Sequence, residues 1–557
     1  MRTIYTLSAF VLFLAHCPAQ TIQWMHDAGS TPFSANERGD AVDADADGNA
    51  YVLGHLAIDS QFSGLPVPAH MDGCLAKYSA NGTVQWVKTF GGPGFVDMDE
   101  HAVKVSTADN AVYVCGAFRT QFANPTIIFD TDTFTYVGNS RHGFLAKYDL
   151  NGNFQWMRHG GGDVGFGGNF NDLDIDDQGR IVAVGNLGGP TVFEGQTLNY
   201  DGGILARYLP DGTLVDLHPL NNGSTENQQA LAVEVALGTG NIYVGGAFFG
   251  NIALDGFSAT STAFNIYVLK LDDALTCQWL NTGGANVDTY GAFLYGTALD
   301  AAENVYITGK ASGLVVPFGP YSFMGHTFYD HEAITAKLDA AGTWQWLRHG
   351  GSEQNDVALD ILADALGNTV ITGYVEGNTN SVEFDGIQLD PVGQSANAFM
   401  ARYDPDGAIV YATLLGGGSD DTGAGLALAN DSTFYLTGTT WGSTPWLNYN
   451  FQSCCADPNL FIAKLNDAFN DMHTGTSAVS SSTNVISIHP NPVSDRLTVR
   501  NLPVKATYVV LDGHGRVVEQ GSSGAAMDAS SWAEGLYVLH IMDADNKSTS
   551  TRFVVAH

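Results

Sequence analysis

Two short phrases recur seven times each along the chain, and this repetition limits the possible folds more than any other feature of the sequence. The first is a turn followed by a β-rich run that ends in glycine, as in DGNAYVLG (47–54) and AENVYITG (302–309). The second is a run with a basic residue near its end, as in FLAKY and ITAKL. The basic residues lie 60 to 70 positions apart and are Lys77, Lys147, Arg207, Lys270, Lys337, Arg402 and Lys464. A period of about 65 residues indicates that one supersecondary unit is repeated along the chain.

Each unit is predicted to contain at least four strands joined by hairpins. Dipeptides such as N-G and D-G supply the positive φ that tight hairpin turns need, and no helical periodicity separates the runs. A four-stranded meander of this size cannot bury both faces alone, but it can when units stack around an axis as the blades of a β-propeller. A repeated tryptophan is expected to pack between neighbouring units; it is Trp24, Trp86, Trp156, Trp279 and Trp346, with Val215 and Val410 near that place in the other two units.

The beginning of the chain repeats a segment that the last unit lacks. QTIQWMHDAG (20–29) matches VQWVKTFGG (84–92), whereas the seventh unit stops after FIAKL (461–465). We therefore expect an all-β protein whose residues 20–466 form a seven-bladed β-propeller closed by the N-terminal strand. Six or eight blades and an open β-solenoid are the alternatives.

The ends of the chain predict export. Residues 1–19 have the features of a secretory signal peptide, with Arg2, an apolar run over 4–15 and a cleavage site before Gln20; a lipoprotein signal at Cys17 is the alternative. No later segment is long and apolar enough for a transmembrane helix. The formal net charge of −35 makes nucleic acid an unsuitable partner.

The C-terminal region has a different composition from the repeats. Residues 467–484 are polar and without period, which is typical of a linker. Seven short strand candidates follow in 485–557 and predict a small C-terminal β-sandwich. They include HPNPVSDRLTV (489–499), LDGHGRVV (511–518), EGLYVLHI (534–541) and a final RFVVAH.

These pieces, in this order and spacing, resemble the type A sorting domain of the type IX secretion system of Bacteroidota. The residues that match its motifs are Pro490, Asn491, Pro492, Gly515, Arg516, Gly535 and Tyr537. The resemblance implies that 485–557 engages the type IX secretion machinery, and that the protein is then released or attached to the outer cell surface. The repeat units are similar to the SBBP-like group of bacterial propeller repeats, which implies a fold more than an activity.

One metal site is suggested by the sequence. Asp43, Asp45 and Asp47 before Gly48 match the first half of an EF-hand calcium loop, but Gly54 stands where a bidentate glutamate belongs. The alternative is that alternating aspartates precede a hairpin on the solvent face of a strand. We expect no other cofactor.

No catalytic constellation is recognisable. HGGGDVG (159–165) lacks the helix start that a phosphate-binding loop needs. His159 and His349 in the two RHGG phrases are either ligands at a channel mouth or part of the repeat pattern. We therefore expect a secreted or cell-surface module that is not an enzyme and acts in binding or adhesion, holding a glycan or protein with the variable stretches around the channel mouth. The alternatives are a polysaccharide-active hydrolase or lyase and a passive surface-layer component.

Overall fold

The structure is a computed structural model, and every regular element in its described residues is a β-strand, which confirms the all-β class. The chain divides into two compact units, Met1–Ala468 and Phe469–His557. The described residues are 21–29, 37–56, 60–62, 65–66, 73–92, 96–120, 126–130, 132–135, 141–161, 167–193, 196–222, 227–284, 291–325, 330–376, 382–430, 433–441, 445–447, 449–450, 458–466, 487–489, 496–500, 507–512, 517–522, 526–532, 535–542 and 548–555.

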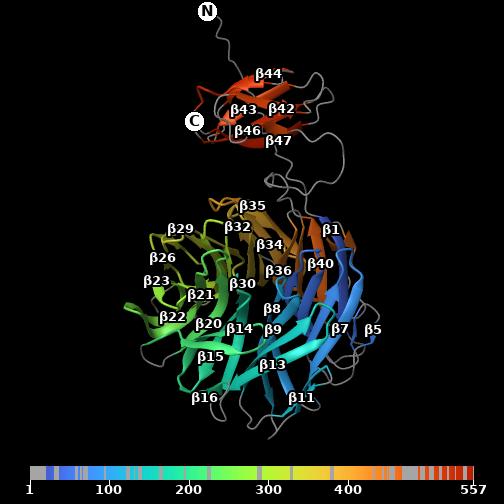
Figure 1. The fold of residues 1–557 in the computed structure, drawn as a ribbon, viewed down its shortest axis with the longest axis vertical. Helices are drawn as coiled ribbons and strands as arrows, with labels where there is room; N and C mark the ends of the chain where they lie inside the picture. Colours follow the sequence, from blue (N-terminus) through green and yellow to red (C-terminus); the bar gives the residue numbers. More distant parts are fainter. Residues whose placement is uncertain are drawn as a thin grey trace, which may run out of the picture. The chain divides into compact units, whose positions relative to one another are not determined.

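In the described part of the first unit, seven antiparallel sheets of four or six strands surround a common centre (Figure 1). Sheet 1 holds β2 (Arg38–Ala44), β3 (Ala50–His55), β6 (Gly73–Tyr78), β7 (Val84–Gly91), β10 (Thr126–Phe129) and β11 (Asp132–Thr135). Sheet 2 holds β8 (Val96–Ser106), β9 (Ala111–Thr120), β12 (His142–Asp149), β13 (Phe154–Gly161), β16 (Pro190–Phe193) and β17 (Gln196–Asn199). Sheet 3 holds β14 (Gly167–Ile175), β15 (Ile181–Gly188), β18 (Gly202–Tyr208) and β19 (Leu214–Pro219).

The remaining sheets follow the same order from the centre outward. Sheet 4 holds β20 (Gln228–Val235), β21 (Ile242–Leu254), β22 (Phe257–Leu271), β23 (Cys277–Gly283), β26 (Val316–Phe318) and β27 (Tyr321–Phe323). Sheet 5 holds β24 (Ala292–Leu299), β25 (Val305–Ser312), β28 (His331–Leu338), β29 (Trp344–Gly351), β32 (Val382–Phe384) and β33 (Ile387–Leu389). Sheet 6 holds β30 (Asp356–Ala363), β31 (Thr369–Glu376), β34 (Ala396–Tyr403) and β35 (Ile409–Leu415). Sheet 7 holds β36 (Thr422–Asn430), β37 (Thr433–Trp441), β40 (Pro458–Asn466), β1 (Thr21–Gly29), β4 (Gln61–Phe62) and β5 (Leu65–Pro66), and the short pair β38 (Pro445–Trp446) and β39 (Tyr449–Asn450) stands apart.

The innermost strands contact one another in a closed cycle. The cycle runs from β2 to β8, β14, β20, β24, β30 and β36, and β36 contacts β2 again. In Figure 1 the labels of β8, β14, β20, β30 and β36 lie near the centre, whereas β11, β16, β23 and β29 lie at the rim. The predicted propeller arrangement is therefore confirmed.

The ring is closed between strands from opposite ends of the unit. β1 pairs antiparallel with β40, from Thr21 opposite Asn466 to Ala28 opposite Leu460. The predicted completion of the last sheet by the N-terminal strand is confirmed, and no covalent hairpin joins these two strands.

The repeated tryptophans lie between neighbouring sheets, as predicted. The Nε1–H of Trp346 donates to the carbonyl of Pro405 at 3.1 Å, and Nζ of Lys337, its cross-strand partner, donates to the same carbonyl at 3.0 Å. The turn of the next hairpin supplies Gly407, whose φ is +78° and whose added Cβ would lie 2.7 Å from the indole. Glycine is needed there both for its backbone conformation and for the close approach of the ring.

In the two sheets without this tryptophan, the glycine of the next hairpin is missing as well. By register, Asp216 in sheet 3 and Tyr411 in sheet 6 take its place. The next hairpin carries Leu275 instead of glycine in sheet 4 and is absent in sheet 7, where the ring closes. Arginine replaces lysine opposite both positions, and Nη1 and Nη2 of Arg207 both donate to the carbonyl of Asp273 at 3.1 Å. One guanidinium thus provides the two donors that lysine and tryptophan supply elsewhere.

Where the structure describes them, the variable stretches between the two repeated phrases lie mostly at the outer edges of the sheets, whereas we expected them around the channel mouth. Most of them form short hairpins that extend the outer edge of the preceding sheet: β4–β5, β10–β11, β16–β17, β26–β27 and β32–β33. Each places an aromatic side chain against the end of an outer strand. Phe193, for example, lies where a Cβ on Gly160 would stand, 2.0 Å from that position. The glycine pair that ends FQWMRHGG (154–161) therefore leaves room for a phenylalanine that comes from the next unit of the repeat.

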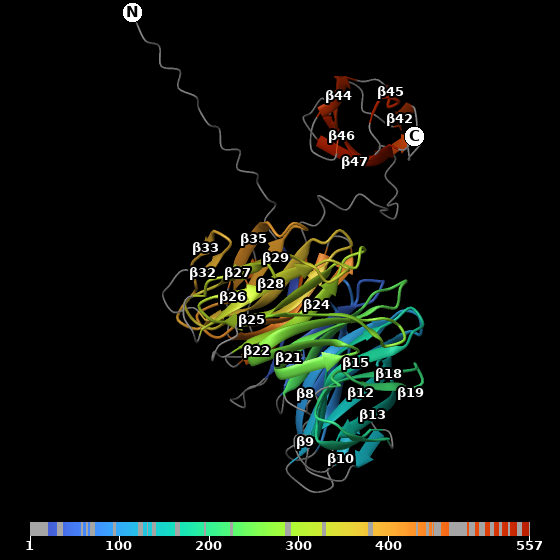
Figure 2. The same cartoon turned by 90° about the vertical axis from the view of Figure 1, so that its left-hand side faces the viewer.

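The C-terminal unit is made of two sheets with a core of its own, and its strands are seen in Figure 2. One sheet holds β41 (Ser487–His489), β42 (Arg496–Arg500) and β45 (Ala526–Asp528), and the other holds β44 (Val517–Ser522), β43 (Thr507–Asp512), β46 (Gly535–Met542) and β47 (Ser548–Val555). Leu497 of the first sheet and Leu539 of the second are fully buried in one cluster. The predicted signal peptide and linker lie outside the described residues. Among the residues that are described, no helix has the length and hydropathy to cross a bilayer.

Candidate functional site

The inner strands enclose a cavity of about 310 Å³ along the centre of the ring. All seven of them contribute lining residues, so every sheet faces the same space in this channel. Because propeller units repeat the same backbone, differences between their inner strands decide the chemistry of the channel.

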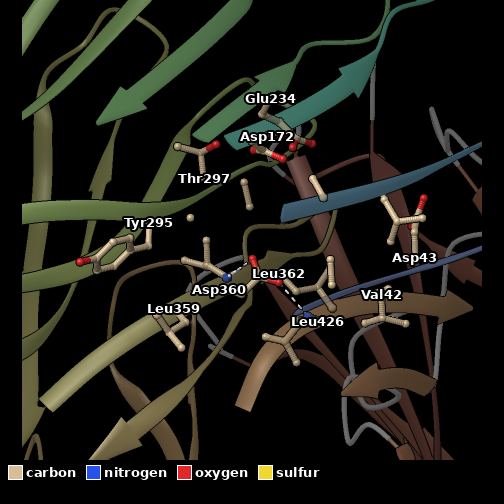
Figure 3. Close-up of a pocket in the computed structure, with 18 of the residues that line it drawn as sticks. Val42, Asp43, Asp172, Glu234, Tyr295, Thr297, Leu359, Asp360, Leu362 and Leu426 are labelled. Atoms are coloured by element: carbon tan, nitrogen blue, oxygen red, sulfur yellow. Dashed lines mark hydrogen bonds between the residues drawn. The ribbon is translucent and has the colours of Figure 1, made fainter. Parts of the chain in front are cut away.

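The wall of the channel is polar on one side and largely apolar on the other. The strands β2, β8, β14 and β20 supply charged groups: Asp40, Asp43, His101, Lys104, Asp172 and Glu234. The strands β24, β30 and β36 supply mainly Tyr295, Ala298, Leu359, Leu362 and Leu428, with Asp360 as the exception. Figure 3 shows Asp172 and Glu234 together on one side of Asp360, and Tyr295 and Leu359 on another.

Most of these carboxylates connect an inner strand to the next one. Asp43 accepts from the backbone N–H of Val105 at 2.7 Å, and Asp172 accepts from that of Val233 at 2.8 Å. Asp174 and Asp360 make the equivalent bonds, to Val235 and Leu426 respectively, each at 2.7 Å. Glu234 instead approaches Nζ of Lys104 at 3.9 Å.

Burial shifts the proton affinities of the channel carboxyls. It raises the pKa of Asp172 to about 7 and that of Asp360 to about 6. The backbone N–H groups that donate to each carboxylate lower its pKa, but by less than burial raises it. Burial also raises the pKa of Glu234, against the attraction of Lys104. For Lys104, burial opposes the charged form, but Asp174 and Glu234 outweigh it and raise its pKa. The channel therefore holds carboxyl groups that can carry protons near neutral pH.

Asp172→Asn is expected to change the pH dependence of stability. A folded-state pKa of about 7, above the unfolded value of about 3.9, stabilises the fold fully below pH ~4, and this contribution is lost as pH rises through ~7. The variant should therefore gain stability relative to the wild type between pH ~4 and pH ~8, by about 1 to 3 kcal/mol. Thermal unfolding across this range measures the difference. Asp406→Asn, at an exposed turn, is the control. If the difference in stability between Asp172→Asn and the wild type is the same at every pH, the raised pKa of Asp172 is contradicted.

The three aspartates of the suggested calcium loop are not brought together. Asp43 faces the channel, Asp45 is buried in the hairpin, and Asp47 is exposed at its turn. Asp45 accepts hydrogen bonds from the backbone and side chain of Asn49 and from the hydroxyl of Tyr51 at 3.0 Å. Its role is thus to hold the turn. Within the described ranges, no three His, Cys, Asp or Glu side chains form a group suited to a metal.

The two RHGG phrases lie on outer strands, away from the channel. Arg158 and Arg348 stack on Trp156 and Trp346 and donate to carbonyls of the next hairpin. His349 packs against the ring of Phe323 at 4.5 Å. The interpretation of these phrases as part of the repeat pattern is supported, and no histidine of theirs reaches the channel lining.

Sequence reasoning did not single out most of the channel residues, although a signal exists. Our first phrase began at the hairpin turn and left out the strand just before it. Alignment of those preceding strands, AVDAD, AVKVS, DLDID and AVEVA, places Asp43, Lys104, Asp174 and Glu234 at one position. The other three units have Ala298, Leu362 and Ala427 there, so the two-sided wall could be read from the aligned repeats.

Of the sorting-domain residues, Pro490, Asn491, Pro492, Gly515 and Arg516 lie outside the described residues. Gly535 begins β46, and Tyr537 on the same strand is 4% exposed and packs on Trp532 with ring centroids 5.3 Å apart. Tyr537 is thus a core residue of this unit.

Comparison with known proteins identifies the C-terminal unit. Residues 487–556 match the family described as the secretion system C-terminal sorting domain. No curated protein matches the chain.

Several solved structures are similar at low identity. PorZ, a surface component of the type IX secretion system of Porphyromonas gingivalis, is 14% identical over 93% of this chain and 65% of its own, with a TM-score of 0.33. A Dyadobacter fermentans protein of unknown function is 9% identical over 81% of this chain and 100% of its own, with a TM-score of 0.34. A GH43_12 protein from a capybara gut metagenome is 11% identical over 80% and 99%, with a TM-score of 0.23. At such scores these similarities carry no argument about activity.

The fold and the matched family together define a class: a β-propeller followed by a C-terminal sorting domain. The sorting domain indicates a type IX secretion substrate that is secreted and located at the cell surface. The similarity of the repeats to the SBBP-like group stays a prediction.

Proposed function

We propose that this protein is a surface-associated β-propeller of seven blades, one for each sheet, that acts as a non-catalytic binding or adhesion module. In this proposal the C-terminal unit is a β-sandwich that engages the type IX secretion machinery, and the propeller presents the ligand site outside the cell.

The observation that carries the proposal is how the side chains divide between repeated and unrepeated positions. The repeated ones, such as Trp346, Lys337 and Gly407, hold sheets together. The unrepeated ones gather on the channel wall, where Lys104 and Glu234 face strands that carry Tyr295 and Leu362. A scaffold alone requires no such departure from the repeat, and a concave space with both polar and apolar groups is typical of ligand sites.

The experiment is binding of the full-length secreted protein to a panel of polysaccharides and surface proteins, with adhesion of cells that lack it as the cellular measurement. We expect saturable binding without turnover and weaker adhesion, restored by the wild-type gene. Absence of binding to every ligand, together with unchanged adhesion, would contradict the proposal and favour a passive surface-layer role.

A polysaccharide-active hydrolase or lyase is the second candidate. It is favoured by carboxyls with raised pKa on the channel wall, Asp172 and Glu234, because glycoside cleavage uses a carboxylic acid that is protonated near neutral pH. The same panel separates the two functions by release of reducing or unsaturated sugar ends. Turnover that disappears in Glu234→Gln would replace the binding function with the enzymatic one.

A further inference from the structure

Four aromatic side chains form a row at one end of the channel. The row, called the aromatic ladder below, consists of Phe249 on β21, Phe264 on β22, and Phe293 and Tyr295 on β24. Successive ring centroids are 5.9, 5.1 and 6.5 Å apart, and the last two pairs are stacked. All four side chains are partly exposed. Tyr295 lines the channel (Figure 3), so the ladder leads from sheet 4 into it.

A lysine stabilises the inner part of the ladder. Nζ of Lys310, on β25, lies 5.4 Å from the ring centre of Phe293 and 5.8 Å from that of Tyr295. One ammonium therefore contacts two rings through cation–π interactions. This holds both rings in place and sets a hydrogen-bond donor beside them.

A polar pocket adjoins the other end of the ladder. It has a volume of about 390 Å³, and its lining includes Asn169, Asn186, Asn227, Gln228 and Gln229 together with several glycines. Arg119, Arg141 and Asp201 also line it, and Arg141 is paired with Asp99. The backbone N–H of Phe249 donates to the carbonyl of Asn227 at 3.1 Å, so the pocket and the ladder are contiguous. Side-chain amides offer a donor and an acceptor each, which suits ligands that carry many hydroxyl groups.

We propose that the aromatic ladder and this pocket bind one chain of a neutral polysaccharide, an inference that rests on the binding function proposed above. The apolar faces of sugar rings would pack on the aromatic faces, and their hydroxyls would bond to the amides. An uncharged chain is favoured because the protein carries a formal net charge of −35. Anionic sugars would be repelled by this charge.

The test uses the full-length protein and the double variant Phe264→Leu/Phe293→Leu, which keeps apolar volume but removes the flat rings. Phe257→Leu is the matched control, since Phe257 is on the same strand as Phe264, is 37% exposed and lies outside the ladder. The probes are laminarin, xyloglucan and soluble starch as neutral chains, and polygalacturonate and alginate as anionic ones. Affinity electrophoresis gives the dissociation constants, and thermal unfolding verifies that the variants fold.

We expect the wild type to bind at least one neutral probe, the double variant to bind it at least about tenfold more weakly, and the control to stay within about twofold. Salt at ~0.5 M should leave this affinity unchanged. Equal binding by the double variant, or binding only to the anionic probes, would overturn the inference and leave the binding function standing. Binding to proteins but to no polysaccharide would do the same, whereas no binding to any ligand of either panel would overturn both.

Discussion

Removal of β1, residues 21–29, is expected to abolish cooperative folding of the propeller unit. This strand pairs with β40 along most of its length and buries Ile22, Trp24, Met25 and Ala28. Burial of a large apolar side chain is worth about 1.5 to 3 kcal/mol, so the three larger residues together approach the whole stability of a typical domain, about 5 to 15 kcal/mol. The deletion would also leave β40 as an unpaired edge, which favours aggregation.

Thermal unfolding and limited proteolysis measure the effect. The truncated chain should lose its cooperative transition and be cleaved within residues 37–466. A synthetic peptide of residues 20–31, added in trans, should restore protection by taking the place of β1, and the same peptide with Trp24→Ala should restore less of it. A truncated chain with an unchanged transition and unchanged protease resistance would show that the ring is stable without the strand.

The role of β1 could be predicted because it depends on local sequence. The missing last segment and its copy at 20–29 are both visible in the repeat, and the turn glycines that define each hairpin act through their own φ angles. The tryptophan positions follow for the same reason. Each of these tryptophans recurs together with the glycine and the carbonyl that its indole contacts in the next unit, as with Trp346, Gly407 and Pro405.

The short hairpins that join neighbouring sheets were missed because their pairing is not local. Strands of two to four residues, such as β4 and β16, have too little periodicity to be recognised, and their partner lies in the preceding unit. A signal is present nonetheless. A phenylalanine before a turn recurs in QFSG, VFEG, PFGP and EFDG, and these contain Phe62, Phe193, Phe318 and Phe384.

The structure does not bring together the three aspartates of the suggested calcium loop, for a physical reason. Three aspartates on alternate residues can surround an ion only if the backbone curls around it. Here Asp43 lies in a regular strand that pairs with β3, whereas Asp45 and Asp47 belong to the hairpin turn. Asp43 accepts a hydrogen bond from the neighbouring sheet, and Asp45 accepts hydrogen bonds within its own turn. The channel itself could not be assembled from one unit, because its lining needs all seven inner strands at once.

Trp346→Ala is expected to lower the free energy of unfolding of the propeller unit by about 3 to 5 kcal/mol, the usual loss for a buried aromatic side chain. Trp346 is 4% exposed, and its indole lies against Gly407 and beneath the guanidinium of Arg348, 5.8 Å from its ring centre. Trp346→Phe keeps part of the packing but loses the hydrogen bond to Pro405, so it should cost less, about 1 to 3 kcal/mol. Urea denaturation followed by circular dichroism measures both.

A double-mutant cycle separates the contact between Trp346 and Gly407 from other effects of the substitution. Gly407→Ala alone lowers the free energy of unfolding in two ways: by the strain of a positive φ and by the overlap of its methyl group with the indole, 2.7 Å away. In a chain that already carries Trp346→Ala, the overlap is gone and only the strain of about 1 to 2 kcal/mol remains. The second substitution should therefore be milder by about 1 kcal/mol or more in that background. If its cost is the same in both backgrounds, the indole does not rest on this turn, and the buried cluster that the two sheets share, which includes Ala298, Tyr306 and Ile371, would hold sheet 5 to sheet 6 without that contact.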